Sequence, residues 1–286
     1  MKINLAKSAG FCFGVKRALN IALSLAGSPK GKNVEMLGDI VHNEDVVCQI
    51  RRTGIKKIKR FGRGAGKTLL IRAHGASNRV MKEALRRGYN IVDATCLMVK
   101  DIHKIVMEME KEGFTIIVIG DKKHEEVKGI VGQLQGAAVI IEDERRIPRR
   151  EIRRIAKACV VVQSTQNLDK AQKIVEALRK RIGDLRFFNT ICAPTRLKQQ
   201  EIKIMPLKND VMVIIGSKTS ANTKRLFEIS RSLNNKTYWV TSKKELKRGW
   251  FTGAGSVGVT SGASTPDAAT HEVIDEIKRL AGGKDP

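Results

Sequence analysis

Short apolar segments recur along the whole chain about every 20 to 30 residues, which is the spacing of α/β units. Segments with helical spacing of their apolar residues lie between them. Continuous apolar strands that alternate with amphipathic helices are typical of parallel sheets covered by helices on both faces. We therefore predict an α/β fold, with strands at 34–37, 68–71, 91–93, 115–119, 137–141, 159–162, 186–188, 211–215, 238–240 and 257–259, and helices at 15–25, 46–52, 79–87, 99–111, 152–157, 168–181, 223–233 and 268–280.

Three of the five cysteines share one local pattern. Cys12, Cys96 and Cys192 are each followed by a β-branched residue three positions on and a basic residue four positions on, where a helix begins. They lie close to a third of the chain apart, which indicates three similar α/β lobes that each present one cysteine at a strand-to-helix turn. We place the lobes at residues 1–95, 96–191 and 192–286, the last with the C-terminal helix, and expect that the C-terminal segment can pack on the first lobe.

The setting of these cysteines favours metal chemistry. Backbone amides and the helix dipole lower the pKa of a thiol at the start of a helix and so stabilise the thiolate. Three thiolates suit a zinc ion with an open fourth position, or a four-iron cluster in which one iron keeps an open site. Cys48, on an amphipathic segment, and Cys159, in a Val-rich strand, lack this setting, and we expect both to be small buried core residues.

Several predicted strands end in small polar loops, and ligands of open α/β sheets bind outside the carboxyl ends of the strands. His42, His74 and His124 stand beside small or polar residues at such ends. Imidazole groups, together with hydroxyls and amides, are suitable donors for a phosphate or diphosphate. His103 in the middle of a helix and His271 in the last helix are expected to be structural.

Further donors follow other strands. Ser220, Asn222 and Ser264 lie in loops that enter helices, where unpaired backbone amides also favour anions. Glu126 is the carboxylate two residues after one of the strand-end histidines, and a proton donor is a role that suits it. The sequence thus indicates an anionic substrate and an acid beside it.

The charge balance first suggests a nucleic-acid partner, because 54 Lys and Arg against 29 Asp and Glu give a formal net charge of +25. Trp239, Trp250, Tyr89 and Tyr238 look isolated, which argues against a base-stacking surface. The segment 62–68 resembles a phosphate-binding P-loop but lacks its first glycine and precedes a strand. The basic residues concentrate in 51–67 and 145–157, which we interpret as solvated surface and as a possible docking face for an acidic electron donor.

The sequence also bears on the compartment. No apolar run approaches the roughly 20 residues that a membrane helix needs, and the N-terminal residues lack the apolar core of a signal peptide. Five scattered cysteines without a C-x-x-C pair argue against a disulfide framework. We therefore expect a cytoplasmic protein with no membrane contact.

At these motifs the chain resembles the 4-hydroxy-3-methylbut-2-enyl diphosphate reductase family of the non-mevalonate isoprenoid pathway. The resemblance runs from about Ile3 to Ile277. Each matching piece is short, but their order and spacing together make the match specific. The pieces are 9–15, 40–43, 72–75, 93–96, 124–127, 163–165, 189–192, 216–223 and 260–266.

The resemblance implies three α/β lobes in a pseudo-threefold arrangement around a central iron–sulfur cluster. Cys12, Cys96 and Cys192 would hold a [4Fe–4S] cluster with one open iron. Glu126 would deliver protons, with His124 beside it, and Ser164 stands where the family usually has Thr near the substrate alcohol. The substrate diphosphate would be bound by His42, His74, His124, Ser220, Asn222 and Ser264.

The implied reaction is the reductive dehydroxylation of (E)-4-hydroxy-3-methylbut-2-enyl diphosphate to isopentenyl and dimethylallyl diphosphates, the last step of the methylerythritol phosphate pathway. The cluster would carry the electron chemistry and the protein would orient the substrate and deliver protons. The implied electron donor is a reduced ferredoxin or a flavodoxin-type protein.

The chain departs from the family pattern near the site. Leu97 and Glu125 stand where the family generally has Pro, Ala221 replaces a usual Ser, and Ala193 and Pro194 are an unusual pair after the third cysteine. No departure removes a cluster ligand or the acid. The alternatives are a paralogous three-cysteine [4Fe–4S] reductase or dehydratase for another diphosphate, a zinc hydrolase, and a basic nucleic-acid-binding protein.

Overall fold

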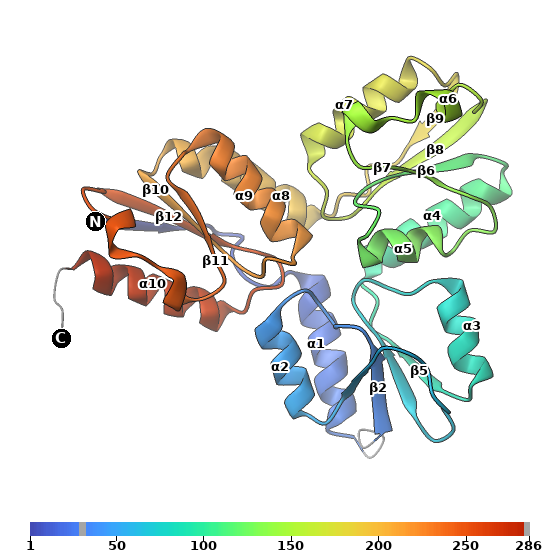
Figure 1. Ribbon diagram of the computed structural model, residues 1–286, viewed down its shortest axis with the longest axis horizontal. Coiled ribbons are helices and arrows are strands. Elements are labelled where there is room, and N and C mark those ends of the chain that lie inside the picture. Colours follow the sequence, from blue (N-terminus) through green and yellow to red (C-terminus); the bar gives the residue numbers. More distant parts are fainter. Residues whose placement is uncertain (29–32, 283–286) are drawn as a thin grey trace. The chain divides into compact units, whose positions relative to one another are not determined.

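The computed structural model describes residues 1–28 and 33–282, and within them it contains three sheets of four parallel strands (Figure 1). Each strand order is given from the edge strand that precedes Cys96, Cys192 or Cys12. The orders are β5-β4-β2-β3 for the first sheet, β9-β8-β6-β7 for the second and β1-β12-β10-β11 for the third. The predicted α/β fold with parallel sheets is therefore confirmed. The strands are β1 Lys2–Leu5, β2 Val34–Leu37, β3 Lys56–Ile58, β4 Thr68–Ile71, β5 Asn90–Asp93, β6 Thr115–Ile119, β7 Val139–Ile141, β8 Lys157–Val162, β9 Asp184–Phe187, β10 Val211–Ile215, β11 Thr237–Val240 and β12 Ser256–Ser261.

Helices connect the strands in the manner of βαβ units. In the described residues the α-helices are α1 Phe13–Ala26, α2 Glu44–Arg52, α3 Asn78–Arg86, α4 Leu97–Lys111, α5 Glu125–Val131, α6 Arg149–Ile152, α7 Leu168–Arg179, α8 Ala193–Ile204, α9 Ala221–Leu233 and α10 Asp267–Ala281. Short 3₁₀ turns occur at Glu144–Arg146, Met205–Leu207, Lys243–Glu245 and Arg248–Trp250.

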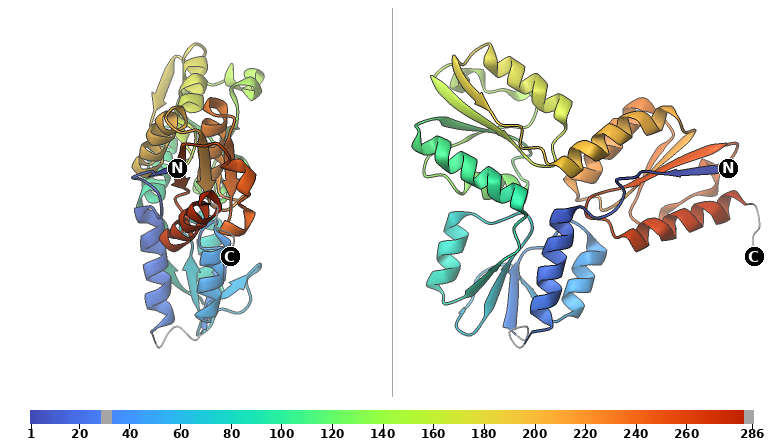
Figure 2. Two further views of the ribbon diagram at one scale, coloured as in Figure 1. Left: turned by 90° about the vertical axis from the view of Figure 1, so that its left-hand side faces the viewer. Right: turned by 180° about the vertical axis from the view of Figure 1, so that it is seen from behind.

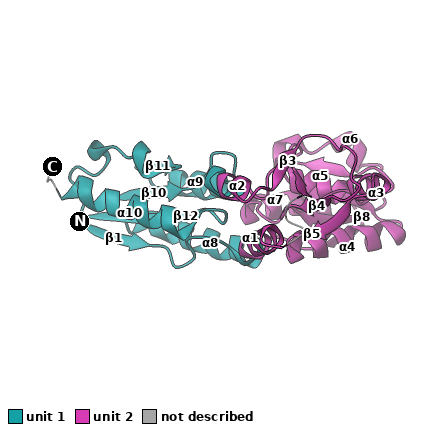
Figure 3. Ribbon diagram, turned by 90° about the horizontal axis from the view of Figure 1, so that it is seen from below, with its two compact units in different colours: residues 1–15, 42–46, 193–286 teal, residues 16–41, 47–192 magenta. Residues whose placement is uncertain are grey.

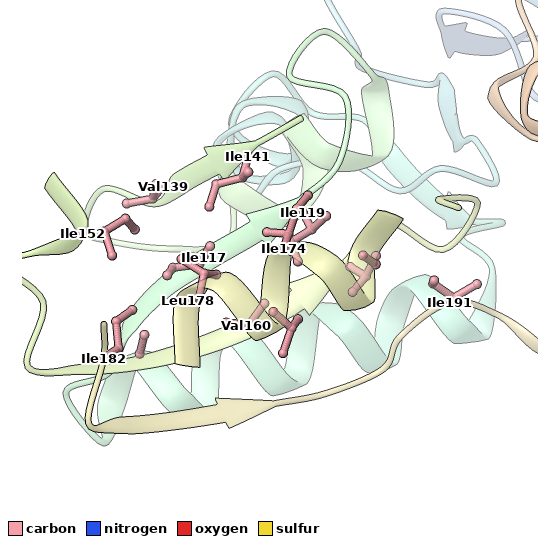
Figure 4. Packing of buried hydrophobic residues seen from close by; sticks show 14 residues of the cluster. Ile117, Ile119, Val139, Ile141, Ile152, Val160, Ile174, Leu178, Ile182 and Ile191 are labelled. Atoms are coloured by element: carbon pink, nitrogen blue, oxygen red, sulfur yellow. The ribbon is translucent and has the colours of Figure 1, made fainter. Parts of the chain in front are cut away.

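The second sheet shows how the apolar strands produce a layered core. Ile117 and Ile119 of β6 pack with Ile174 and Leu178 of α7 on one face (Figure 4). The alternate residues of the same strand, such as Ile116, face α4 and α5 on the other side. A strand covered on both faces must be apolar at every position, which is why β6 reads as an unbroken apolar run.

The other two sheets are also packed against helices. On the first sheet, residues of β4 pack with α3 and the residues that follow it. On the third sheet, β10 and β12 pack with α10 on one face, and β10 packs with α8 and α9 on the other. Each sheet therefore has its own apolar core, which agrees with three similar α/β lobes.

The N-terminal strand corrects the predicted lobe boundaries. β1 pairs with β12 in parallel, with Lys2 beside Ser256 and Leu5 beside Val259, so it belongs to the third sheet and not to a lobe formed by residues 1–95 (Figure 2). The three patterned cysteines likewise follow edge strands: Cys12 follows β1, Cys96 follows β5 and Cys192 follows β9. Cys96 therefore lies at the end of the first sheet instead of opening a second lobe, and the C-terminal helix α10 packs on the third sheet.

Other elements differ from the predictions at the surface of the fold. The edge strands β1 and β3 were not predicted, because their residues are half exposed and do not form an apolar run. Helix α5 was also missed, and α8, whose start after Cys192 was predicted, had been given no range; α8 has Pro194 in its first turn, where a missing backbone N–H is tolerated. The predicted helix 152–157 is wrong, since α6 ends at Ile152 and β8 begins at Lys157.

The aromatic residues are less isolated than their sequence positions suggest. The rings of Tyr238 and Trp250 stack with centroids 4.0 Å apart, and Phe227 lies against Trp239 at 5.5 Å. Tyr238 and Trp250 pack against the core of the third sheet. They therefore contribute to folding and do not form an open platform for bases.

The chain forms two compact units (Figure 3). One consists of residues 1–15, 42–46 and 193–286, and the other of residues 16–41 and 47–192. The first unit contains the third sheet, and the second contains the other two sheets. Within the described ranges, none of the helices has the length and apolar character needed to cross a bilayer.

Candidate active site

The three predicted cluster cysteines occupy the same structural position in their sheets. Each backbone N–H donates to a carbonyl in the loop after the neighbouring strand: Cys12 to Ala263 at 3.0 Å, Cys96 to Ala73 at 2.9 Å and Cys192 to Ser164 at 3.0 Å. Each cysteine directly or closely precedes a helix, namely α1, α4 or α8, and each is half-buried. The short sequence pattern thus marks a structural repeat.

The chemistry of these cysteines fits a metal cluster. All five cysteines of the chain lie in the described residues and none is in a disulfide. Cys96 is the N-cap of α4, where the helix dipole favours a thiolate. Cys159 is fully buried on β8, and burial raises the pKa of its thiol to about 12, so it is an inert core residue as predicted. Cys48 is exposed on α2, which contradicts its predicted burial.

Glu126 is a buried carboxylate with polar contacts in the second unit. It is 2% exposed, and its carboxylate accepts hydrogen bonds from the backbone N–H of Ser164 at 2.6 Å and from the Ser164 hydroxyl at 2.8 Å. Burial raises the pKa of this carboxyl above its ordinary value, and the two hydrogen bonds oppose the rise. The Ser164 carbonyl also accepts a hydrogen bond from the Cys192 backbone N–H. Ser164 therefore contacts both the Glu126 carboxylate and the turn that carries Cys192.

The structure brings two of the predicted histidines together beside this acid. The rings of His74 and His124 lie edge to face, with centroids 5.5 Å apart. His124 is the N-cap of α5, and its Nδ1 accepts a hydrogen bond from the Glu126 N–H at 3.2 Å. An Nδ1 that accepts a bond leaves the proton of a neutral imidazole on Nε2, so His124 can donate from that atom.

His103 and His271, the two histidines that were expected to be structural, lie in helices α4 and α10. His103 is buried in α4, and burial lowers the pKa of its imidazole to about 4, so it stays neutral. It packs against Gly75, which has a φ of +78° and follows His74 directly. A side chain at position 75 would contact this ring, so the glycine allows the loop to turn over His103. His271 is exposed on α10.

The other predicted substrate residues lie in the first unit. The Ser264 hydroxyl donates to the His42 carbonyl at 2.9 Å. Ser220 is the N-cap of α9, and its hydroxyl accepts from the Thr223 N–H at 3.3 Å. Asn222, in the first turn of α9, is 4% exposed, and neither amide atom of its side chain has a hydrogen-bond partner in the described part of the chain.

This orphaned amide indicates a ligand. A buried polar group without a partner costs about 1–3 kcal/mol, so it is normally satisfied by protein, water or a bound molecule. The Thr223 hydroxyl beside it is also buried without a partner among the described residues. Sequence reasoning did not single out Thr223, although it directly follows Asn222 at the start of a helix. Hydroxyl and amide donors at a helix N-terminus suit an anion.

Glu125, which departs from the family pattern, has a defined role in the loop geometry. Its carboxylate pairs with Arg72 at 2.5 Å and with Lys128 at 3.0 Å. Burial raises the pKa of Glu125, but the hydrogen bonds and charges of Lys128 and Arg72 outweigh it and leave the pKa lowered. Arg72 stands two residues before His74, and Glu125 directly follows His124, so this ion pair ties together the loops that carry the two histidines.

We expect Arg72 and Glu125 to couple in a double-mutant cycle made with Arg72→Met and Glu125→Gln. The side chains are 18% and 31% exposed, so a coupling of about 0.5–1 kcal/mol in the free energy of unfolding is expected at neutral pH. Because the folded-state pKa of Glu125 is lowered, the coupling is present above its ordinary pKa and disappears as the pH falls through the folded value. Urea unfolding at several pH values measures this coupling. If the effects of the two single substitutions on the free energy of unfolding simply add at neutral pH, the ion pair does not connect the two loops.

Comparison with known proteins places the chain in a family. Residues 3–278 match the family model described as LytB protein. Proteins named 4-hydroxy-3-methylbut-2-enyl diphosphate reductase are 38% identical in Geotalea uraniireducens (strain Rf4), over 98% of each chain, and 39% identical in Geobacter metallireducens (strain ATCC 53774 / DSM 7210 / GS-15), over 99% of each.

Solved structures agree with this placement. A structure described as (E)-4-hydroxy-3-methyl-but-2-enyl diphosphate reductase, the terminal enzyme of the non-mevalonate pathway, has 35% identity and a TM-score of 0.72 over 98% of this chain and all of its own. The E-1-hydroxy-2-methyl-but-2-enyl-4-diphosphate reductase from Plasmodium falciparum has 25% identity and a TM-score of 0.89 over 97% of this chain and 88% of its own. As its motifs indicate, the chain belongs to the LytB family, whose members compared above are named 4-hydroxy-3-methylbut-2-enyl diphosphate reductase.

Proposed function

We propose that the chain catalyses the reductive dehydroxylation of (E)-4-hydroxy-3-methylbut-2-enyl diphosphate to isopentenyl and dimethylallyl diphosphates, the last step of the methylerythritol phosphate pathway. The names of its relatives over nearly the full length support this reaction. The observation that carries the proposal is the buried Glu126 carboxyl, which is bonded to Ser164 next to a cysteine turn. A reductive dehydroxylation needs a proton donor, and a buried carboxyl of this kind can serve as one.

Cys12, Cys96 and Cys192 are our proposed ligands of a [4Fe–4S] cluster. Three reduced thiols at helix starts, each in the same turn, are a donor set that fits such a cluster with one iron left open. When bound, the cluster supplies two electrons, one at a time, and an open coordination position.

The protein side chains manage protons and orientation. Breaking the allylic C–O bond consumes two electrons and two protons, because the hydroxyl leaves as water and the allyl carbon skeleton gains a hydrogen. Glu126 can hold a proton because burial raises its pKa, and Ser164 fixes the direction of the carboxyl. His124 can donate from Nε2, because its Nδ1 accepts a hydrogen bond from the Glu126 backbone N–H.

The diphosphate would be bound by imidazole, hydroxyl and amide donors. Asn222 supports this assignment, because its buried amide lacks a protein partner among the described residues. The complete proposed set is His42, His74, His124, Ser220, Asn222 and Ser264.

Asn222→Leu is expected to raise the substrate KM by about tenfold to a hundredfold while the ligand-free protein becomes more stable. The change removes one substrate contact and an unsatisfied buried amide that costs about 1–3 kcal/mol. Steady-state kinetics and urea unfolding measure the two effects. Asn209→Leu is the matched control, since Asn209 is also buried but accepts from Asn4 at 2.6 Å and donates to Met205 at 2.8 Å; it should lose stability. Loss of stability in both variants would remove the ligand role of Asn222.

An acidic electron carrier of the ferredoxin or flavodoxin type is our proposed donor, and a reducing cytoplasm our proposed compartment. The exposed basic residues of segments 51–67 and 145–157 support docking of an acidic partner, and the reduced cysteines support the compartment. Higher salt should reduce turnover with the protein donor more than turnover with a small chemical reductant, because salt screens the docking charges. Equal salt effects on both reactions would refute docking.

The function is tested by anaerobic purification and cluster reconstitution, followed by an absorption spectrum near 400 nm, iron counting and turnover with a reduced donor. A brown protein that converts the hydroxymethylbutenyl diphosphate supports the proposal. A brown protein without this turnover would indicate a reductase or dehydratase for another diphosphate. A colourless protein would favour a zinc hydrolase, or nucleic-acid binding if its affinity falls steeply with salt.

A further inference from the structure

A buried lysine holds the segment that leads to Cys12. Lys198 of α8 is 2% exposed, and its ammonium donates to three backbone carbonyls: Ser8, Gly10 at 3.2 Å and Ser261 at 3.0 Å. Lysine side chains are almost never fully buried unless they are paired. Burial lowers the pKa of this ammonium to about 8, and the electrostatic interactions with Cys12, Glu201 and Asp267 oppose that shift.

A second side chain of the same helix binds the same segment. Glu201, three residues after Lys198, accepts from the backbone N–H groups of Lys7 and Ser8, both at 2.9 Å, and from the Ser8 hydroxyl. Helix α8 therefore holds the segment before Cys12 with two charged side chains. The Lys198 ammonium binds backbone carbonyls of the segment, and the Glu201 carboxylate binds backbone N–H groups of the same segment. Residues three apart lie on one face of a helix, so both charges reach the loop together.

The end of the segment is fixed by the loop after β12. The Gly10 N–H donates to the Ser261 hydroxyl at 2.7 Å, and the Cys12 N–H donates to the Ala263 carbonyl at 3.0 Å. Gly10 has a φ of +88°, and a Cβ at this position would overlap the Asp267 carboxylate. These contacts fix the backbone that leads into Cys12. Lys198 connects this backbone to β12, because its ammonium donates to the carbonyls of Ser8 and Gly10 and also to the carbonyl of Ser261.

We propose that Lys198 is a positioning residue of the Cys12 site: its ammonium fixes the turn that presents Cys12 and brings a buried positive charge to the Gly10 carbonyl, two residues before that cysteine. The inference rests on the proposed function, because it takes Cys12 as a cluster ligand. A positive charge in a site of low dielectric stabilises a nearby anion strongly. The reduction potential of an iron–sulfur cluster depends on the net charge around it, so this cation favours the reduced cluster.

Three variants separate holding the loop from supplying the charge. Lys198→Met removes the donors and the charge, Lys198→Arg keeps both, and Glu201→Gln weakens the same loop from the anionic side. In the metal-free protein, hydrogen exchange at the amides of Ser8, Gly10 and Cys12 should accelerate more than about tenfold in Lys198→Met, because hydrogen bonds from a charged group contribute about 1.5–3 kcal/mol each. Glu201→Gln should also accelerate it.

In the reconstituted protein, Lys198→Met should carry less iron and a cluster of lower reduction potential, whereas Lys198→Arg should keep the wild-type potential. Glu201→Gln should not lower the potential, since it removes a negative charge. Equal potentials in the wild-type protein and Lys198→Met, or an equally lowered potential in Lys198→Arg, would overturn the role of the charge. Unchanged exchange in Lys198→Met would overturn the positioning role.

The proposed function and this inference fail in different ways. A wild-type protein that holds no iron after reconstitution would refute the cluster assignment and with it the role of the charge, while the exchange measurements would still decide the positioning role. If Lys198→Met does not fold, Lys198→Gln replaces it, because glutamine keeps hydrogen-bond donors and lacks the charge.

Discussion

Replacing Glu126 with Gln is expected to lower kcat by about 10²–10⁴-fold, which is the usual contribution of a positioned acid. Gln keeps the shape of the side chain and can still accept from Ser164, but it has no proton to deliver. Iron content should not change, because Glu126 is not among the proposed ligands. Steady-state kinetics on protein of equal iron content measure the effect.

The pH dependence gives an independent check on the same residue. Since burial raises the pKa of Glu126, the protonated acid persists to higher pH than for an ordinary carboxyl, and kcat should fall as the pH rises through that value. The charged form is the costly one in the folded state, so the free energy of unfolding should also fall over this range in the wild-type protein. Glu126→Gln should lack both changes.

Glu142→Gln serves as the control for this variant, because Glu142 lies in another strand-end loop and is exposed. It should keep the wild-type kcat and pH profile. Near-normal turnover in Glu126→Gln would remove Glu126 from the mechanism and leave the proton donor to another group.

Cys96→Ser is expected to abolish iron binding and reduce turnover to background while the protein still folds. Cys96 is the N-cap of α4, and serine is among the preferred N-cap residues, so the helix start should be preserved. A serine hydroxyl is a poor replacement for a thiolate in an iron–sulfur cluster. Iron counting, absorption near 400 nm and circular dichroism measure these effects, and Cys12→Ser and Cys192→Ser should lose iron as well.

The other two cysteines provide matched controls for the same experiment. Cys48→Ala changes an exposed residue and should leave both stability and iron content unaltered. Cys159→Ala should lose some stability, because Cys159 is fully buried in the second sheet, but it should keep its iron. Iron loss in either control would mean that the ligand set has been chosen wrongly.

The buried framework of this fold could be predicted from the sequence, because strands covered on two faces must be apolar throughout. β6, β8 and β10 are of this kind, and all three were predicted at nearly their observed positions. The edge strands β1 and β3 could not be found in this way, since their residues are exposed or only partly buried and do not form an apolar run. That β1 joins β12, some 250 residues away in the chain, is a pairing that no local pattern encodes.

The candidate site likewise has features that local sequence motifs predict and features that depend on packing. The chemical groups that stand at the strand ends can be read from local motifs, because the cysteine turns, the histidines and Glu126 occur in them. Which of these groups are buried, and what they touch, depends on how distant segments pack together. Lys198 resembles any other lysine of a basic amphipathic helix, yet it is buried because residues 8–10 and 261 cover it. The burial of a side chain depends on distant segments that pack over it, and that is the physical reason why its role is absent from the local sequence.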